Sequence, residues 1–134
     1  MRREDLDLID NVKVAPVIFQ EFVPAECDLR VTAVGEKLFA AAIRSPPSNC
    51  SIDFRMSVGN ADLRAEELPA AVEQKLLALQ KRLGLAYGAI DLRRTPDGEY
   101  YFFEVNTAGE FLFIEDRTGQ PIAAAIADWL VGAM

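Results

Sequence analysis

The chain has 134 residues, of which 14 are basic and 21 are acidic, and its formal net charge is −7. This length is sufficient for one domain with a hydrophobic core. The acidic balance disfavours a nucleic-acid partner, since surfaces that bind nucleic acid are usually basic. The sequence contains no histidine, which excludes Ser-His-Asp and Cys-His catalysis and histidine-ligated zinc. Any chemistry must therefore use carboxylates, amides, lysine, arginine or a bound ion.

The cysteines and the apolar segments favour a cytoplasmic protein with no membrane partner. Cys27 and Cys50 are the two cysteines of the chain, too few for a disulfide framework or a four-cysteine zinc site, and we expect reduced thiols. The first ten residues lack the apolar stretch of a signal peptide. The apolar run over residues 122–134 is interrupted by Asp128 and is too short to span a bilayer.

The N-terminal part predicts a short segment outside the domain, followed by a strand. Residues 1–16 are mostly polar or charged, and we expect a linker or a frayed segment there, with the domain itself over residues 17–134. Residues 17–23 are rich in β-forming side chains and end at Pro24, which is typical of a strand that stops at a proline.

A hairpin, a further strand and two helices follow. Residues 28–34 alternate between polar and apolar and are joined by a glycine-containing turn to residues 38–43, which predicts a hairpin. Residues 51–57 fit a further short strand. One helix is predicted from Pro69 to the residue before Gly84, and another begins near Pro121. Strand pairs with flanking helices indicate an α+β domain built on an antiparallel sheet.

The second half of the chain carries the most informative signal, a predicted hairpin with an acidic pair. Asp97 and Gly98 predict a turn of two or four residues between two β-prone runs. A turn centred there places Asp91 opposite Glu104, and Asn106 then lies on the same face as Glu104. The opposite face of this hairpin is predicted to be an apolar core surface: Ile90, Leu92, Phe103 and Val105.

Two opposed carboxylates need neutralisation. Side chains that face each other across strands are ~4.5–5.5 Å apart at Cβ, where two charges repel by roughly 3 kcal/mol at an effective dielectric constant of 20. A divalent cation would remove that repulsion, and Asn106 would add a neutral oxygen ligand. Hard oxygen ligands suit Mg²⁺ or Mn²⁺. The alternative is that Asp91 and Glu104 are acidic groups of a solvent-facing sheet with Arg93 nearby.

At this point the sequence resembles a known family. Asp91 followed by Glu104-Val105-Asn106 resembles the metal-binding motif of ATP-grasp ligases. The segments FQEFVPAECDLRVTAVG and NTAGEFLFIEDRTGQPIAAAIADWL are similar to the microviridin-type ATP-grasp enzymes, which join side chains within ribosomal precursor peptides. The segments AAIRS and DFR are similar to the ribosomal-protein glutamate ligases. The resemblance extends from Val17 to Leu130 and implies an ATP-grasp C-terminal subdomain.

The resemblance implies a nucleotide site. Glu21, Phe22 and Val23 would hold the adenine of ATP, chiefly through backbone groups, and Asp28 would accept hydrogen bonds from the ribose hydroxyls. Arg55 would contact the ATP phosphates. The residues alone also fit plainer interpretations, with Glu21 on a solvated strand face, Asp28 in a surface ion pair and Arg55 in an exposed loop.

The resemblance also implies the chemistry. Asp91, Glu104 and Asn106 would hold one or two Mg²⁺ ions that bridge the phosphates, and Arg30, with Arg55, would act near the phosphates or the incoming carboxylate. The family activates a carboxylate as an acyl phosphate, which an amine or hydroxyl then attacks. Such a reaction depends mainly on positioning and charge neutralisation. An ion pair of Arg30 is the alternative to a catalytic role.

Two departures from the family pattern qualify these expectations. Thr107 replaces the proline that commonly follows the metal-binding asparagine, which predicts a less constrained loop. The family places ATP between two subdomains, and nothing before Val17 resembles the first one. We therefore expect a C-terminal half that is inactive alone and needs the N-terminal lobe or a partner chain to act on a peptide or amino-acid substrate. The alternative is a non-catalytic nucleotide- or metal-binding module, or a homodimerising one.

Overall fold

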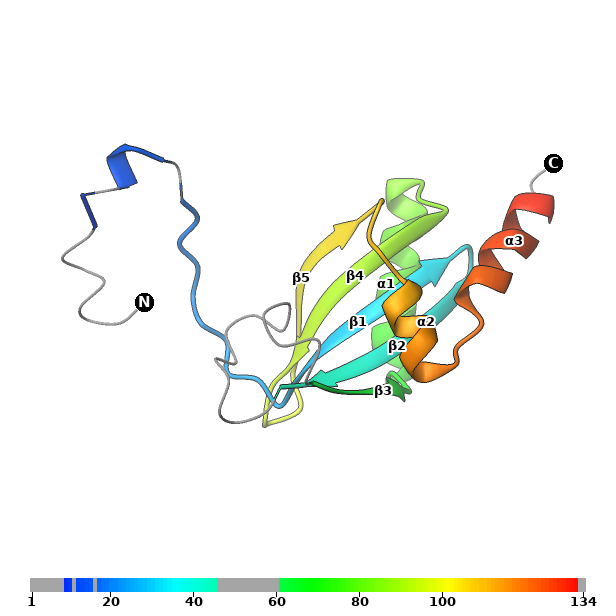
Figure 1. Cartoon of the computed structure of the whole chain (residues 1–134), viewed down its shortest axis with the longest axis horizontal. Coiled ribbons are helices and arrows are strands. Elements are labelled where there is room, and N and C mark those ends of the chain that lie inside the picture. Colours follow the sequence, from blue (N-terminus) through cyan, green and yellow to red (C-terminus); the bar gives the residue numbers. More distant parts are fainter. Residues whose placement is uncertain (1–8, 11, 16, 46–60, 133–134) are drawn as a thin grey trace.

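The structure, a computed structural model, describes residues 9–10, 12–15, 17–45 and 61–132. In these residues the chain forms a five-stranded antiparallel sheet in the order β3-β2-β1-β4-β5, with three helices (Figure 1). The strands are β1 (Cys27–Val34), β2 (Lys37–Arg44), β3 (Asp62–Glu66), β4 (Tyr87–Arg94) and β5 (Tyr100–Asn106). The helices are α1 (Ala70–Leu83), α2 (Leu112–Thr118) and α3 (Ile122–Gly132). The predicted α+β class with an antiparallel sheet is confirmed.

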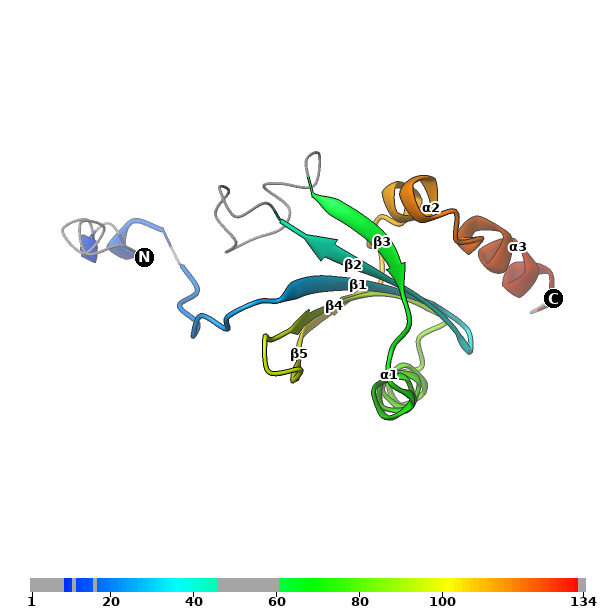
Figure 2. The ribbon, with the colours of Figure 1, turned by 90° about the horizontal axis from the view of Figure 1, so that it is seen from below.

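The sheet has a helical layer on each face. Figure 2 shows α1 on one face and α2 and α3 on the other. Because successive side chains of a strand point to opposite faces, each strand contributes to two cores. The core on the α1 side consists of Cys27, Leu29, Val31, Ala33, Ala40, Ala42, Leu68, Leu76, Ile90 and Leu92. The core on the side of α2 and α3 consists of Val34, Ala41, Ile43, Ala61, Leu63, Ile114, Ile122 and Ala125.

The predicted hairpin and the two predicted helices are confirmed. The β1–β2 hairpin pairs Val34 with Lys37 around Gly35, whose φ is +58°, a conformation that favours glycine. Helix α1 follows Pro69 and ends at Gly84, which is left-handed and donates its N–H to the carbonyl of Lys81 at 3.2 Å. In the part of the chain that the structure describes, every helix is too short or too polar to cross a bilayer.

Residues 17–25 do not form the predicted strand; they have no regular secondary structure, and Figure 1 shows them leading away from the sheet. A β-strand needs a neighbour to satisfy its backbone hydrogen bonds, and β-propensity alone does not supply one. Ile18 and Phe19, the strongest β-formers of this segment, are accordingly 90% and 61% exposed. The possible strand at 51–57 lies outside the described residues, and β3 and α2 were not predicted.

The β4–β5 hairpin has a three-residue loop. The N–H of Thr95 donates to the carbonyl of Glu99 at 2.9 Å, and the N–H of Gly98 donates to the carbonyl of Thr95 at 2.9 Å. Gly98 has a φ of +87°, which a three-residue hairpin loop with a terminal left-handed residue requires. The predicted loop of two or four residues is therefore wrong by one residue.

A β-bulge in β5 restores the predicted pairing at the acidic residues. Near the turn, Arg93 pairs with Tyr101, one residue away from the predicted register. The register then shifts between Asp91 and the next residue of β4, and Asp91 lies opposite Glu104 as predicted. Phe103, at the shift, is not in the predicted core; it is 44% exposed and its ring centroid lies 5.4 Å from the Arg93 guanidinium. The rest of the predicted apolar face packs in or against the α1-side core: Ile90, Leu92 and Val105.

Candidate functional site

Four charged side chains of β1 and β4 form two cross-strand ion pairs, which we call the charge quartet. Asp28 lies opposite Arg93, and Arg30 lies opposite Asp91. Arg93 donates from Nε and Nη2 to the two carboxylate oxygens of Asp28 at 2.7 and 3.1 Å, and Arg30 donates from Nη1 to Oδ1 of Asp91 at 2.8 Å. No side chain of the quartet is more than 11% exposed. The plain alternative of an ion pair for Asp28 and Arg30 thus holds in part, but the pair of Asp28 is buried and that of Arg30 is partly buried.

The quartet lies on the sheet face that carries α2 and α3. Cys27, Leu29 and Val31 of β1 point into the α1-side core, so Asp28 and Arg30, which alternate with them, point to the other face. The Arg30 guanidinium lies 5.9 Å from the ring centroid of Phe113 in α2. Its Nε is buried and makes no hydrogen bond, and the same is true of the hydroxyl of Thr32, two residues further along β1. Buried polar atoms without partners are rare in proteins, and Arg30, which carries one of these two, contacts Asp91 of the acidic pair.

The predicted acidic pair is assembled beside Arg30. Asp91 and Glu104 are direct partners on β4 and β5, and Asn106, partner of Ala89, lies on the same face of β5 as Glu104. Asp91 is 7% exposed, whereas Glu104 and Asn106 are open to solvent. Within the described ranges no group of three or more histidine, cysteine, aspartate or glutamate side chains could hold a metal ion, so a cation here would depend on two carboxylates and one amide.

This donor set fits Mg²⁺ or Mn²⁺ in a particular way. All three donors are hard oxygens, which these cations prefer. Arg30 already neutralises one of the two carboxylates, so Asp91, Glu104 and Arg30 together carry a net charge of about −1. Such a site attracts a bare dication weakly. It suits a cation that arrives with additional negative ligands, as Mg²⁺ does with phosphates.

The loop after Asn106 is held in place even though Thr107 stands where the family commonly has proline. The N–H of Ala108 donates to Oδ1 of Asn106 at 2.9 Å, and the Tyr87 hydroxyl donates to the carbonyl of Gly109. Burial raises the pKa of the Tyr87 phenol, which keeps this donor protonated. These two contacts hold the loop at Ala108 and Gly109.

The residues predicted to hold adenine lie close to the quartet. Nη1 of Arg93 donates to the carbonyl of Val23 at 2.9 Å, and the guanidinium lies 6.0 Å from the ring centroid of Phe22. Phe22 is 54% exposed, and Glu21 is exposed as well. Arg93 and Phe103 therefore lie beside the predicted adenine segment, whereas the sequence placed Phe103 in the core and Arg93 only near the acidic pair. The β1–β4 register would have identified Arg93 as the partner of Asp28.

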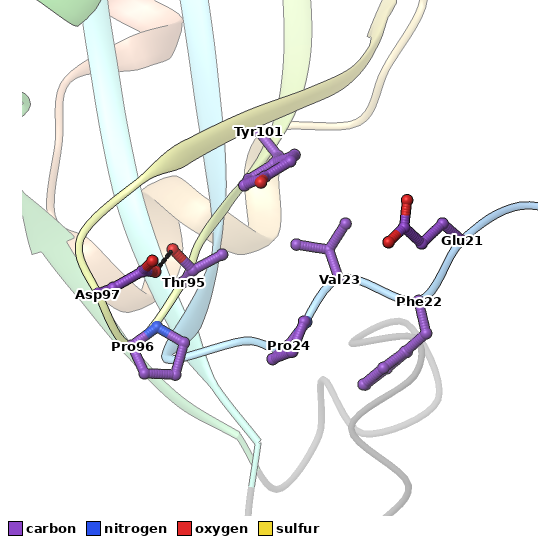
Figure 3. A pocket seen from close by; sticks show the side chains of 8 residues that line it. All are labelled: Glu21, Phe22, Val23, Pro24, Thr95, Pro96, Asp97 and Tyr101. Atoms are coloured by element: carbon purple, nitrogen blue, oxygen red, sulfur yellow. Dashed lines mark hydrogen bonds between the residues drawn. The ribbon is translucent and has the colours of Figure 1, made fainter.

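A pocket of about 370 Å³ lies next to this segment (Figure 3). On one side it is lined by Glu21 and the three residues that follow, and on the other by Tyr101 and the β4–β5 turn. Figure 3 shows the side chains of Val23 and Tyr101 facing each other, while the ring of Phe22 lies on the opposite side of the segment from the Val23 side chain. The Thr95 hydroxyl donates to the carboxylate of Asp97 and fixes the turn that forms the pocket wall.

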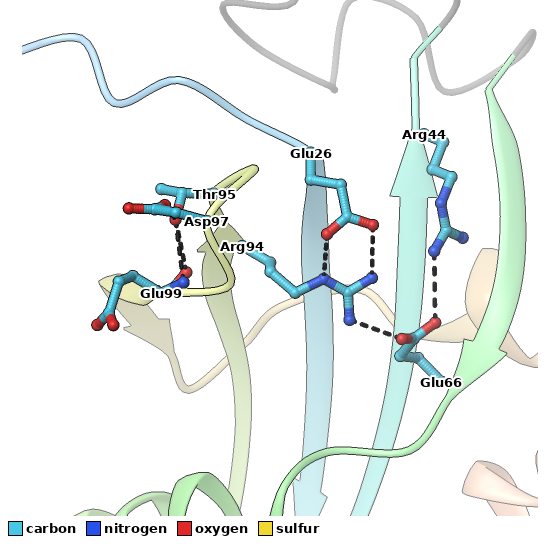
Figure 4. Close-up of polar contacts among 7 residues, drawn as sticks. All are labelled: Glu26, Arg44, Glu66, Arg94, Thr95, Asp97 and Glu99. Atoms are coloured by element: carbon cyan, nitrogen blue, oxygen red, sulfur yellow. Dashed lines mark hydrogen bonds and ion pairs between the residues drawn. The ribbon is translucent and has the colours of Figure 1, made fainter.

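A second ion network fixes the end of the sheet where this segment enters β1 (Figure 4). Arg94 forms a fork with Glu26 at 2.7 and 3.1 Å and also donates to Glu66 at 2.7 Å, and Arg44 lies 3.7 Å from Glu66. The hydrogen bonds from Arg94 hold the pKa of Glu26 below its ordinary value, and these carboxylates in turn raise the pKa of Arg94. The network joins β2, β3 and β4 to Glu26, the residue directly before β1. Arg55, the remaining predicted site residue, lies outside the described residues.

Comparisons with known proteins identify the domain. The RimK-like ATP-grasp domain family matches residues 2–130. The macrocyclase MdnC from Microcystis aeruginosa MRC, bound with the precursor peptide MdnA, is 41% identical with a TM-score of 0.83, over 99% of this chain and 41% of its own. A RiPP-associated ATP-grasp ligase from Chryseobacterium gregarium, in complex with ADP and a leader and core peptide, is 31% identical with a TM-score of 0.87, over 100% of this chain and 41% of its own. The ATP-grasp ligase PsnB, complexed with a minimal precursor variant, Mg and ADP, is 26% identical with a TM-score of 0.80, over 98% of this chain and 41% of its own.

The chain spans about two fifths of the length of these solved structures. No curated protein matches it. The family match covers nearly all of the sequence, and it includes the charge quartet, the acidic pair and the segment beside Arg93. The chain belongs to the RimK-like ATP-grasp family.

Proposed function

We propose that this chain is the nucleotide- and metal-binding C-terminal part of an ATP-grasp ligase that forms an amide or ester bond within a ribosomal precursor peptide. Two similar proteins support the substrate class, since MdnC is bound with a precursor peptide and the Chryseobacterium gregarium ligase with a leader and core peptide. The ADP and Mg in the PsnB complex support the cofactors. The domain boundary at residue 17 and a cytoplasmic location belong to the same proposal.

The observation that carries the proposal is the acidic pair beside a partly buried arginine. Asp91 and Glu104 are opposed on paired strands with Asn106 on the same face, and Arg30 contacts Asp91. Bound Mg²⁺ or Mn²⁺ would neutralise the phosphate oxygens of ATP and help to orient the phosphoryl group that is transferred. Arg30, whose Nε has no hydrogen-bond partner, would contact the phosphates or the carboxylate substrate.

The base and ribose would lie along the segment that contacts Arg93. Glu21, Phe22 and Val23 would offer backbone groups to adenine, and the half-exposed rings of Phe22 and Phe103 provide apolar surface on which a base can stack. Asp28 uses one acceptor position on each oxygen for Arg93. A carboxylate has about four such positions, so the same group can also accept hydrogen bonds from ribose hydroxyls.

The proposed reaction has two steps. A carboxylate oxygen of the peptide attacks the γ-phosphorus of ATP, the bond to the β-γ bridging oxygen breaks, and ADP leaves. An amine or hydroxyl of the same peptide then attacks the acyl carbon, loses its proton and releases phosphate. The chain's own part in this is to bind ATP and to offset negative charge with Arg30 and, by resemblance, Arg55. We propose that turnover also requires a region equivalent to the part of the related ligases that this chain does not cover.

A second candidate function is a module that binds nucleotide without catalysis or forms a homodimer. One observation favours self-association, namely that three consecutive apolar residues of α3, Trp129, Leu130 and Val131, are 41%, 56% and 69% exposed. Sedimentation velocity tests it, because a monomer at concentrations where the nucleotide is bound would contradict a required dimer.

Calorimetry with Mg²⁺ and a non-hydrolysable ATP analogue tests the main proposal. We expect the chain to bind the analogue with Mg²⁺ and much more weakly with EDTA. The double variant Asp91→Asn/Glu104→Gln should lose this metal dependence. Asp62→Asn, which changes a carboxylate on the far edge strand of the sheet, should retain it. Equal affinity of the acidic-pair variant and the parent chain would refute the proposed metal site.

A further inference from the structure

Arg93 connects three parts of the proposed nucleotide site. Its guanidinium forms a fork with Asp28 at 2.7 and 3.1 Å and donates to the carbonyl of Val23 at 2.9 Å. The rings of Phe22 and Phe103 lie within 6.0 Å of it, close enough for cation–π attraction. Arg93 itself is 4% exposed, so it is a buried support for these groups and not a surface ligand.

Asp28 and Val23, both hydrogen-bonded to Arg93, are groups that a nucleotide would meet under the proposed function. Val23 belongs to a segment that makes no strand pairing, so its position depends on contacts such as this one. Asp28 lies at the start of β1, where a fork from a planar guanidinium fixes both oxygens of the carboxylate. A lysine in place of Arg93 would keep the charge but could not form the same fork.

We propose that Arg93 is a positioning residue that holds the Val23 carbonyl and the Asp28 carboxylate in the arrangement that recognises the base and ribose of the nucleotide. This inference rests on the proposed nucleotide-binding function. It goes further in predicting which part of the nucleotide loses recognition, because Arg93 donates to the Val23 carbonyl and the Asp28 carboxylate, the groups proposed to meet the base and the ribose. Loss of Arg93 should reduce the contribution of the ribose hydroxyls while phosphate and metal recognition remain.

The test compares two nucleotides by calorimetry in the presence of Mg²⁺: ATP and 2′,3′-dideoxy-ATP, which lacks both ribose hydroxyls. The parent chain should prefer ATP by about tenfold, the usual effect of hydrogen bonds to a charged group. In Arg93→Gln and in the milder Arg93→Lys this ratio should fall to within about twofold of unity. The control is Leu76→Ala, a cavity-forming change in the α1-side core, which lowers stability and should keep the ratio.

Amide hydrogen exchange at Glu26 gives a second readout that needs no nucleotide, because its N–H donates to the carbonyl of Arg94 at 2.8 Å between the two contacts of Arg93. In Arg93→Lys this amide should exchange about tenfold faster than in the parent chain, the effect of losing about 1.4 kcal/mol of local protection, and the increase should exceed that in Leu76→Ala. If the parent chain binds ATP and the Arg93 variants keep both the ratio and the exchange rates, the positioning role is wrong and nucleotide binding stands. If the parent chain binds neither nucleotide, the proposed function fails and this inference fails with it.

Discussion

Replacing Arg30 by glutamine should turn the acidic pair into a site that responds to magnesium alone. In the parent chain, Arg30 lies 2.8 Å from Asp91, and the two side chains are 11% and 10% exposed. Their attraction amounts to about 4 kcal/mol for charges ~4 Å apart at an effective dielectric constant of 20. Loss of one partner from a buried pair costs about 3–5 kcal/mol, since a buried charge is left without compensation.

The substitution also removes the positive charge that offsets the repulsion between the two carboxylates. Asp91 then faces Glu104 with no cation between them, which adds at most about 3 kcal/mol of repulsion, reduced by the solvent exposure of Glu104. We therefore expect Arg30→Gln to lower the free energy of unfolding by about 3–5 kcal/mol in EDTA. Mg²⁺ at ten times its dissociation constant should return about 1.4 kcal/mol.

Urea unfolding with and without 10 mM MgCl₂, at matched ionic strength, measures this effect. The parent chain should respond little, because Arg30 already neutralises Asp91. The double variant Arg30→Gln/Asp91→Asn should regain part of the lost stability and should not respond to Mg²⁺. The reasoning is wrong if the parent chain and Arg30→Gln are stabilised by Mg²⁺ to the same extent, or if the double variant is stabilised as much as the single one.

Three further predictions concern positions elsewhere in the domain. Gln80 is 2% exposed, and neither polar atom of its amide has a hydrogen-bond partner. Gln80→Met, which conserves the volume, should therefore raise the free energy of unfolding by about 1–2 kcal/mol. An unchanged midpoint of urea unfolding would contradict this. A methyl group on Gly109 would overlap the side chain of Ala89; Gly109→Ala should cost about 1–3 kcal/mol and weaken Mg²⁺-dependent nucleotide binding, whereas Gly132→Ala, which meets nothing within 4 Å, should do neither. Burial raises the pKa of the Cys27 thiol above its ordinary value of 9.0, so the folded state favours the protonated thiol. The contribution of this thiol to the free energy of unfolding should be complete below pH 9 and should fall as the pH rises further. In Cys27→Ala the free energy of unfolding should fall less over that range.

The sequence predicted the acidic pair correctly, although one step of the derivation was wrong. A turn centred between Asp97 and Gly98 gives the register that pairs Asp91 with Glu104. In the structure the loop has an odd number of residues, which moves the register by one, and the bulge at Phe103 moves it back. Turn propensity carries no information about a bulge six residues away. The alternation of polar and apolar side chains does constrain the register, because a slip of one residue would place charged side chains in the core.

The charge quartet, by contrast, could not be derived from local patterns. Asp28 and Arg93 are 65 positions apart, and their register depends on how β1 packs against β4. Residues 17–23 show the converse case: a strong local β-pattern remains without strand structure since no neighbour pairs with it. Local sequence thus predicts elements whose partner is adjacent in the chain, whereas the tertiary fold decides pairings between distant segments and the contacts that follow from them.

The two ion pairs of the quartet suit different tasks under the proposed function. Buried ion pairs seldom stabilise a fold more than apolar residues of similar size would, so a pair of them on a sheet face calls for another reason. The Arg30–Asp91 pair borders the exposed side chain of Glu104, and both members have a new partner when Mg²⁺ and a triphosphate bind: the cation for Asp91 and a phosphate for Arg30. The exchange leaves neither charge uncompensated. The Asp28–Arg93 pair is bidentate and less exposed, at 8% and 5%, which fits a fixed support that keeps its partner throughout.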